Sequence, residues 1–225
     1  MNKICLALAC LFFASTGFTQ NVNSGPHDAP QLTPAISIAA SIPNETTADE
    51  YFADAEKNER RGDLNDALTL FGKAAFEYNN DKKFSRYGAA LLRMSNVHML
   101  LSQYTEAEHV ILGAVIKIYS RIGSMSGQMA AYNQLGKIYL ASNKLTQSLW
   151  FYTQQGIIAK QLKNNTSYID SIIGIATVKI KKKDFYLATK DLNRAELLAK
   201  NSKITQFSQQ IKNYRQSISD KTSKK

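Results

Sequence analysis

The sequence predicts an all-α protein, a solenoid of four helical hairpins closed by a C-terminal capping helix. Three observations predict this class. No proline occurs after Pro43. Apolar residues recur from Asp49 onward at three- and four-residue spacing, which is typical of amphipathic helices. A short pattern of bulky and small residues also returns about every 40 residues, as in repeat proteins. Four prolines and eleven glycines in 225 residues are few for a β-sandwich, which needs many turns.

Residues 1–20 have the layout of a secretory signal peptide. One positive charge in Met1–Lys3 precedes the apolar run Ile4–Ala14, and small and polar residues follow. We expect cleavage between Gly17 and Asn21. One alternative is a retained membrane anchor, although the run is shorter than the ~20 apolar residues of a spanning helix. Another is a lipoprotein anchored at Cys10, although the residues before Cys10 match the usual lead-in poorly.

Both cysteines, Cys5 and Cys10, lie inside this segment. The mature chain is therefore expected to have no disulfide, no thiolate nucleophile and no cysteine metal site. Residues 21–48 hold all four prolines and are expected to form a mobile, disordered linker. No later stretch is apolar enough for a transmembrane segment after cleavage. The sequence thus predicts an exported protein, periplasmic or secreted.

The repeat is anchored by one small residue in each copy, and these residues are separated by 40, 41 and 40 positions. The anchors are Ala67, Ala107, Ser148 and Ala188. A bulky residue precedes each anchor by three positions, at Leu64, Tyr104, Leu145 and Phe185. Another small residue precedes each by twelve, at Ala55, Ser95, Gly136 and Ala176. Because a small side chain lets a neighbouring helix backbone approach closely, each anchor is expected at a close helix–helix contact, and the upstream small residue marks the preceding helix of the same hairpin.

The pattern resembles the tetratricopeptide repeat, whose signature combines Trp-x2-Leu-Gly-x2-Tyr with Ala-x3-Phe and a terminal proline. The third copy supplies Tyr132, Leu135, Gly136 and Tyr139, and the first supplies Ala67-x3-Phe71. The terminal proline is missing from every copy. The period is about 40 residues rather than 34, so the resemblance is to a long-period bacterial variant of the family.

The solenoid is expected to occupy residues 49–220, with a basic tail at 221–225. The helices are expected at 48–61, 64–78, 87–101, 104–121, 127–141, 145–162, 167–182 and 185–199, followed by a capping helix at 204–219. Phe207, Ile211, Tyr214 and Ile218 form an apolar stripe on that last helix. A terminal repeat needs such a cap because its outer face meets water.

No catalytic signature is present, so the sequence predicts a non-enzymatic protein without a cofactor. Phosphate-binding glycine loops, His-Glu-x2-His and Gly-x-Ser-x-Gly are all absent. His98 and His109 have no partner at ligand spacing, so we expect no metal site. Gly123 and Gly127 are expected in a loop between repeats, where glycine has a structural use.

The positive charge is concentrated at the C-terminal end. Residues 160–225 contain 15 basic and 5 acidic residues, whereas residues 49–159 contain 12 and 11. The candidate basic patch consists of Lys179, Lys181, Lys182 and Lys183. It could contact an anionic surface or an acidic partner, or it could simply be a solvated end of the solenoid. No nucleic acid is expected, because no aromatic residues interleave with the lysines.

The resemblance implies that a protein partner, as a peptide or a helix, lies in a concave groove lined by the first helices. Copy-by-copy matching gives the candidate groove residues Glu56, Arg93, Asn96, Asn133, Lys137 and Thr177. The family's carboxylate clamp needs Lys and Asn where this chain has Phe52 and Glu56, so recognition of a chaperone C-terminus is not expected. The resulting hypothesis is a monomeric scaffold or adaptor of the bacterial cell envelope. The alternative is an exported sensory module that acts in trans on a signalling receptor.

Overall fold

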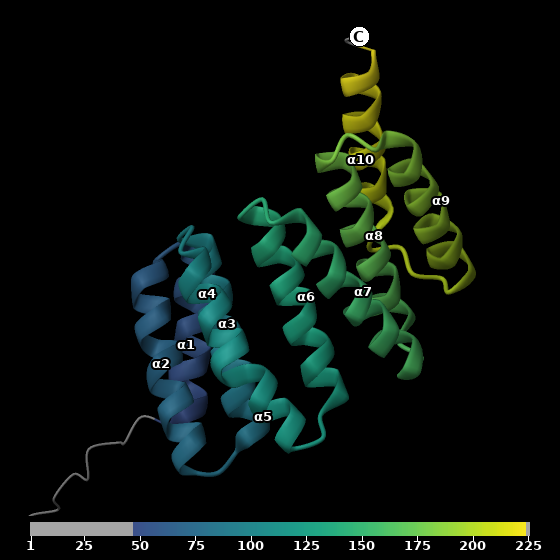
Figure 1. The fold of residues 1–225 in the computed structure, drawn as a ribbon. Coiled ribbons are helices and arrows are strands. Elements are labelled where there is room, and N and C mark those ends of the chain that lie inside the picture. Colours follow the sequence, from purple (N-terminus) through teal and green to yellow (C-terminus); the bar gives the residue numbers. More distant parts are fainter. Residues whose placement is uncertain (1–46, 224–225) are drawn as a thin grey trace, which may run out of the picture. The chain divides into compact units, whose positions relative to one another are not determined.

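The computed structural model describes residues 47–223, and every regular element in that range is helical (Figure 1). The expected signal peptide, most of the expected linker, and Lys224 and Lys225 lie outside the described residues. The helices are α1 (Ala48–Arg61), α2 (Leu64–Asn80), α3 (Phe84–Leu100), α4 (Tyr104–Val110), the π-helical turn η1 (Ile111–Val115), α5 (Ile116–Arg121), α6 (Met125–Ala141), α7 (Leu145–Gln161), α8 (Asn165–Lys181), α9 (Phe185–Asn201) and α10 (Ser208–Thr222).

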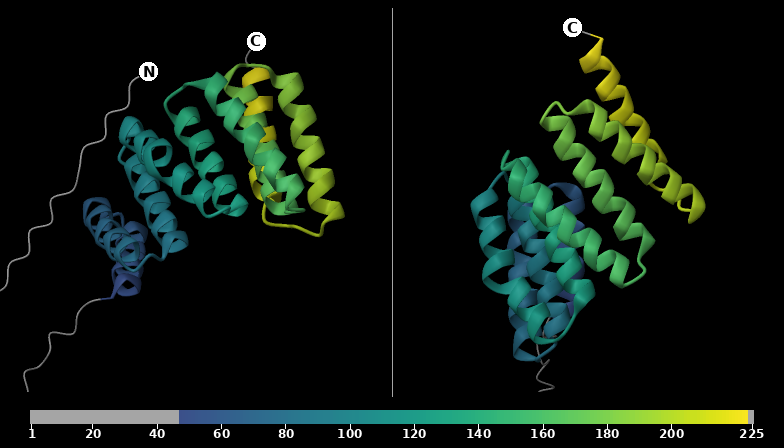
Figure 2. Two further views of the ribbon diagram at one scale, coloured as in Figure 1. Left: turned by 60° about the horizontal axis from the view of Figure 1, so that its bottom comes forward. Right: turned by 45° about the vertical axis from the view of Figure 1, so that its right-hand side comes forward.

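The helices form four hairpins and a cap, as the sequence predicts. Helices α4, η1 and α5 make one rod with a π-helical turn inside it. The hairpins are therefore α1–α2, α3 with this rod, α6–α7 and α8–α9. Consecutive helices lie side by side (Figure 2), and α3 also contacts α6. None of the helices in residues 47–223 combines the length and the apolar character needed to cross a membrane.

The small residues of the repeat lie where the two helices of a hairpin cross. All four anchors are fully buried. In the second hairpin the Ser95 hydroxyl donates to the carbonyl of Ala107 at 2.8 Å, and in the third the Ser148 hydroxyl donates to the carbonyl of Gly136 at 2.8 Å. A side chain that reaches the facing backbone requires a close helix–helix contact. The close helix–helix contact predicted at the anchors is confirmed at Ala107 and Ser148, and the structure shows that the small residue twelve positions upstream is the one they meet.

Buried tyrosines of the second helices fill hollows opened by glycines on the first helices. A Cβ added to Gly127 would lie 2.3 Å from the Tyr119 ring, and Gly88 approaches the same side chain from α3. Tyr152 is held in the same way between Gly136 and Gly174. The expectation that Gly127 lies in a loop is wrong, because it belongs to the first turn of α6 and is needed there for close packing.

The capping helix covers the last hairpin. Phe207, Ile211 and Ile218 are buried in a cluster with residues of α8 and α9, whereas Tyr214 is only partly buried. The expected bounds need correction, because α10 begins at Ser208 rather than at 204 and reaches Thr222. Lys221 and Thr222 are thus helical and do not belong to a tail. Ile204 instead bonds its N–H to the carbonyl of Ala199 and so closes the end of α9.

Most helix ends lack the glycine that usually marks them. Non-glycine residues occupy the left-handed conformation at Lys82, Ser102, Asn143, Lys163, Lys183 and Lys203. The following N–H reaches back to satisfy a carbonyl of the last turn, as Gln103 does with His98. With no glycine at the turns before them, the expected starts of α3 at 87 and of α8 at 167 are three and two residues late. The expected start of α6 is also two residues late, although Gly123 in the left-handed conformation marks the turn before it.

Candidate partner-binding surface

The first candidate residues lie in a charged cluster that joins α1 to α3. Arg93 on α3 places Nη2 2.7 Å from a carboxylate oxygen of Glu59 and 3.3 Å from one of Glu56. Asn96, one turn further along α3, donates from Nδ2 to the other oxygen of Glu59 at 2.6 Å. The guanidinium of Arg93 also lies over the ring of Phe71, 5.6 Å from its centroid.

Glu59 is the centre of this cluster, although sequence comparison did not select it. Its side chain is only 9% exposed, whereas those of Glu56 and Arg93 are 36% and 35% exposed. A buried carboxylate needs cationic and hydrogen-bonding partners, and Arg93 and Asn96 supply both. The signal was present in the sequence, since Glu59 follows Glu56 by three positions and therefore shares its helix face.

A second polar cluster joins α6, α7 and α8. Asn133 donates from Nδ2 to Asp170 Oδ2. The buried Gln155 of α7 donates to the same oxygen at 2.9 Å and lies 3.3 Å from the carbonyl of Ser167. Asp170 and Gln155 were also missed, because matching to the family pattern selects positions on each first helix separately and ignores pairing between repeats.

The remaining two candidates differ from the others. Lys137 on α6 is exposed, and within 47–223 no hydrogen bond or ion pair engages its side chain. Thr177 is half-buried, and its hydroxyl donates to the carbonyl of Ile173 within its own helix at 2.9 Å. The structure therefore brings Glu56, Arg93 and Asn96 together and places Asn133 in a separate cluster.

The basic patch is largely engaged in structural contacts. Lys179 forms an ion pair with Asp191 of α9 at 2.6 Å, and Lys181 donates to the carbonyl of Leu140 at the end of α6 at 2.9 Å. Lys182 and Lys183 are exposed in the turn between α8 and α9. Two of the four lysines thus remain available for an anionic surface.

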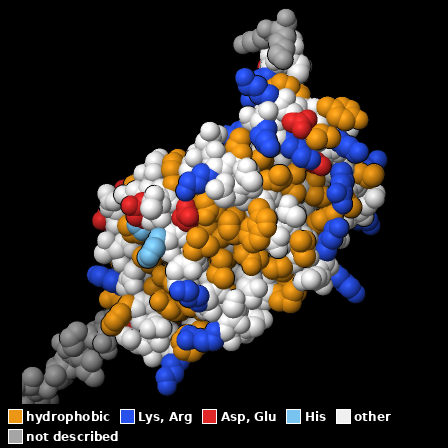
Figure 3. All heavy atoms as spheres, viewed as in Figure 1, with side chains coloured by type: hydrophobic (Ala, Val, Ile, Leu, Met, Phe, Trp, Pro, Cys, Tyr) orange, Lys and Arg blue, Asp and Glu red, His pale blue; other side chains and the backbone are white. Residues whose placement is uncertain are grey.

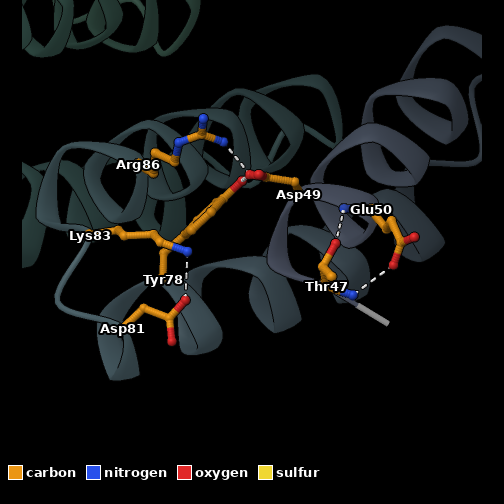
Figure 4. Close-up of polar contacts among 7 residues, drawn as sticks. All are labelled: Thr47, Asp49, Glu50, Tyr78, Asp81, Lys83 and Arg86. Carbon is orange, nitrogen blue, oxygen red and sulfur yellow. Dashed lines mark hydrogen bonds and ion pairs between the residues drawn. The ribbon is translucent and has the colours of Figure 1, made fainter. Parts of the chain in front are cut away.

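A third polar cluster joins the first two repeats at the end where the described chain begins (Figure 4). The hydroxyl of Tyr78 donates to Asp49, which also pairs with Arg86. The Tyr78 hydrogen bond and the Arg86 charge lower the pKa of Asp49. Burial, followed by the hydrogen bond to Asp49, raises the pKa of Tyr78. These contacts link α1, α2 and α3 at the start of the described chain.

The described residues contain no group of three or more His, Cys, Asp or Glu side chains that could hold a metal ion. His98 and His109 nevertheless line the same surface hollow, together with Glu106. The Nδ1 atom of His98 lies 2.7 Å from the side-chain oxygen of Gln103, so one ring nitrogen is already engaged.

Comparison with known proteins supports the fold. No protein-family model matches the chain, and no curated protein matches it in sequence. Among solved structures, the crystal structure of BtubC (BKLC) from P. vanneervenii is similar, with a TM-score of 0.62 and 15% identity over 69% of this chain. The matched region covers 64% of BtubC, less than two thirds of its length.

Two further similar structures come from a putative kinesin light chain of Podosopora anserina, whose repeats are described as nearly identical and TPR-like. One of them gives a TM-score of 0.56 at 13% identity, over 70% of this chain and 77% of that one. The other gives 0.53 at 15% identity, over 68% and 76%. The fold is TPR-like. Identities this low establish the shared fold alone.

Proposed function

We propose that the chain is a non-enzymatic scaffold that binds a segment of another protein on the face of its first helices. A stack of helical hairpins forms an extended surface suited to protein partners. The observation that carries the proposal is a series of polar side chains that contacts between repeats hold in place on α1, α3 and α6. Arg93 is fixed by Glu59, and Asn133 by Asp170. Side chains ordered in advance lose less entropy on binding.

Lys137 is the residue of this face best placed to contact a partner directly. It is exposed on α6, four residues after Asn133 and therefore on the same side of the helix. Arg93 and Asn133 can each present only the donor groups that their carboxylate partners leave open. A partner segment with backbone carbonyls or a carboxylate near Lys137 fits this set of donors.

We further propose that the scaffold acts in the bacterial cell envelope and belongs among long-period variants of the repeat. The basic and apolar residues of the first twenty positions support export. The spacing of the four anchors supports the long period. Fractionating the native cells and sequencing the N-terminus of the recovered protein tests export, and an intact Met1–Gln20 segment on protein found in the cytosolic fraction would contradict it.

The experiment for the binding face compares two lysine variants with the same change of charge. Proteins retained by the wild-type chain from envelope extract are identified, and the affinity of each purified pair is measured. Lys137→Glu should weaken binding at least about tenfold, as expected when a contact in the middle of an interface is lost. Lys117→Glu, on an exposed position of α5, should leave affinity unchanged. Equal affinities for both variants would refute the proposed face.

Alanine scanning of this face needs care, because its residues also hold the fold together. Arg93→Ala would leave the 9% exposed carboxylate of Glu59 without its cation. Removing one partner of such a buried pair typically costs about 3–5 kcal/mol of stability. Loss of binding by that variant would therefore not show direct contact with a partner, whereas Lys137 is free of this ambiguity.

A further inference from the structure

A stripe of exposed side chains follows one side of α7, which is a second helix and not part of the face discussed above. Trp150, Thr153, Ile157 and Lys160 stand three or four residues apart and so share one side of the helix. Trp150 is 52% exposed and Ile157 is 46% exposed. On the side of the molecule seen in Figure 3, hydrophobic side chains gather around the middle, over the region of α6 and α7.

Trp150, the one tryptophan of the chain, is held in place by two aromatic neighbours. The ring of Phe151 meets it edge-on at 4.6 Å between centroids, and the ring of Tyr132 from α6 does so at 6.2 Å. An aromatic side chain that is fixed but half exposed loses little entropy on contact with a partner. Tryptophan is also among the residue types that most often dominate binding energy at interfaces.

The stripe leads into a crevice between α7 and α9, with α8 as its floor. The crevice has a volume of about 180 Å³, below the roughly 300–1,000 Å³ of small-molecule sites, so it fits a side chain better than a cofactor. It is lined by Tyr152, Thr153, Gly156, Ile157, Lys160, Tyr168, Ser171, Ile172, Ile175 and Arg194. A Cβ on Gly156 would lie 2.7 Å from the Ser171 hydroxyl, so glycine helps to keep this space open.

The charge of the crevice is entirely positive. Lys160 Nζ lies 4.9 Å from the ring centroid of Tyr168, and the guanidinium of Arg194 lies 5.6 Å from it and donates to the Tyr168 hydroxyl. No carboxylate lines the crevice, and within 47–223 no ion pair engages Lys160 or Arg194. Two cations held over an apolar floor attract a carboxylate that arrives together with an apolar group.

We propose that the α7 stripe and this crevice dock a segment of a partner protein in which an apolar side chain stands next to a carboxylate. The apolar group contacts Trp150 and Ile157, and the carboxylate meets Lys160 and Arg194. The inference rests on the proposed role as a protein-binding scaffold, but it concerns a different surface from the first-helix face. A partner can therefore bind the α7 stripe and crevice without contacting the first-helix face, or the reverse.

The test selects ligands from a library of displayed random 12-residue peptides on the full chain. Peptides enriched on the wild type should combine an apolar residue with an adjacent Asp or Glu. A Lys160→Glu/Arg194→Glu variant should weaken them at least about tenfold and should itself enrich peptides with Lys or Arg at that position. Ile157→Asp should weaken the wild-type ligands similarly. All three positions are exposed, so circular dichroism should show an unchanged fold.

The matched control is Lys182→Glu/Lys183→Glu. It changes the net charge by the same amount at two exposed positions in the turn between α8 and α9. It should leave the selected peptides bound with wild-type affinity. Equal weakening by both double variants, or displacement of the peptides by single-stranded oligo(dT), would show a general polyanion effect and overturn the inference. Peptides lost only on Lys137→Glu would also overturn it while supporting the first-helix face. Enrichment of no peptide at all would overturn this inference, whereas the first-helix face is judged separately by the Lys137→Glu and Lys117→Glu variants with partners from envelope extract.

Discussion

Gly136 is a position where one added methyl group should destabilise the protein although the helix gains an alanine. A Cβ there would lie 2.7 Å from Cε1 and 2.8 Å from Cδ1 of Tyr152, well inside the roughly 3.5–4.0 Å of a favourable carbon contact. The ring cannot retreat toward α8, because Gly174 approaches it closely from the other side. Either the ring or the α6 backbone must therefore move.

The magnitude follows from comparing Gly136→Ala with Gly72→Ala. A Cβ on Gly72 in α2 would meet nothing within 4 Å, so this variant should gain the full helix preference of alanine, about 1 kcal/mol. Gly136→Ala gains the same preference but adds the clash, and overpacking of a buried contact costs about 1–3 kcal/mol. Since the preference cancels, the difference between the two variants measures the clash and should be about 1–3 kcal/mol.

Urea unfolding of both variants and the parent, followed by far-UV circular dichroism, provides the measurement. A double-mutant cycle then tests the cause, because Tyr152→Leu removes the ring that the new methyl group would meet. The cost of Gly136→Ala should be smaller in that background. If Gly136→Ala is as stable as Gly72→Ala, or if its cost is the same with Leu at position 152, the tyrosine is not confined as the structure indicates.

Three further predictions concern helix content, the crossing points and alkaline pH. The far-UV spectrum should be that of a predominantly helical protein; substantial strand content would contradict the fold. Ala107→Leu should cost about 1–3 kcal/mol in urea unfolding, because Ser95 already reaches the Ala107 carbonyl at 2.8 Å, whereas Ala107→Ser should cost less. Burial raises the pKa of Tyr119 to about 12, so the unfolded chain loses this proton first and stability should fall between about pH 10 and 12. Tyr119→Phe should show a shallower fall in the urea midpoint.

The hairpins could be predicted from sequence because their determinants are local. Apolar spacing defines which side of each helix is buried, and the pairs of small residues define where two helices cross. Ala107 and Ser95 stand twelve positions apart in the sequence and touch in the structure. The ends of helices were harder to place, because residues such as Ser102 and Asn143 adopt a left-handed conformation for which glycine is the usual signal.

The candidate surface was only partly predictable, since its polar groups pair between repeats. Glu59 contacts Arg93 and Asn96, and Asp170 contacts Asn133 and Gln155. The partners in each set are too far apart along the sequence for a rule of local spacing to pair them. Family matching found one side of each pair and missed the other. The crevice beside α7 depends on Lys160, Tyr168 and Arg194, which come from three helices and form no linear motif.

The second and third anchors are 41 residues apart in the sequence, and the structure shows the cause of the extra residue. The helices that carry the other anchors each have 17 residues, and the inward residue of their last turn follows the anchor by eleven positions, as Tyr78 follows Ala67. In the second repeat the corresponding Tyr119 follows Ala107 by twelve.

One extra residue in an α-helix would rotate the rest of the helix by about 100° and turn Tyr119 away from the core. The π-helical turn Ile111–Val115 takes up that residue, because its wider hydrogen-bonded loop holds one residue more. Ala107 before the turn, Ile111 and Val115 at its two ends and Tyr119 after it therefore face the same core, and Tyr119 reaches the space left by Gly88 and Gly127.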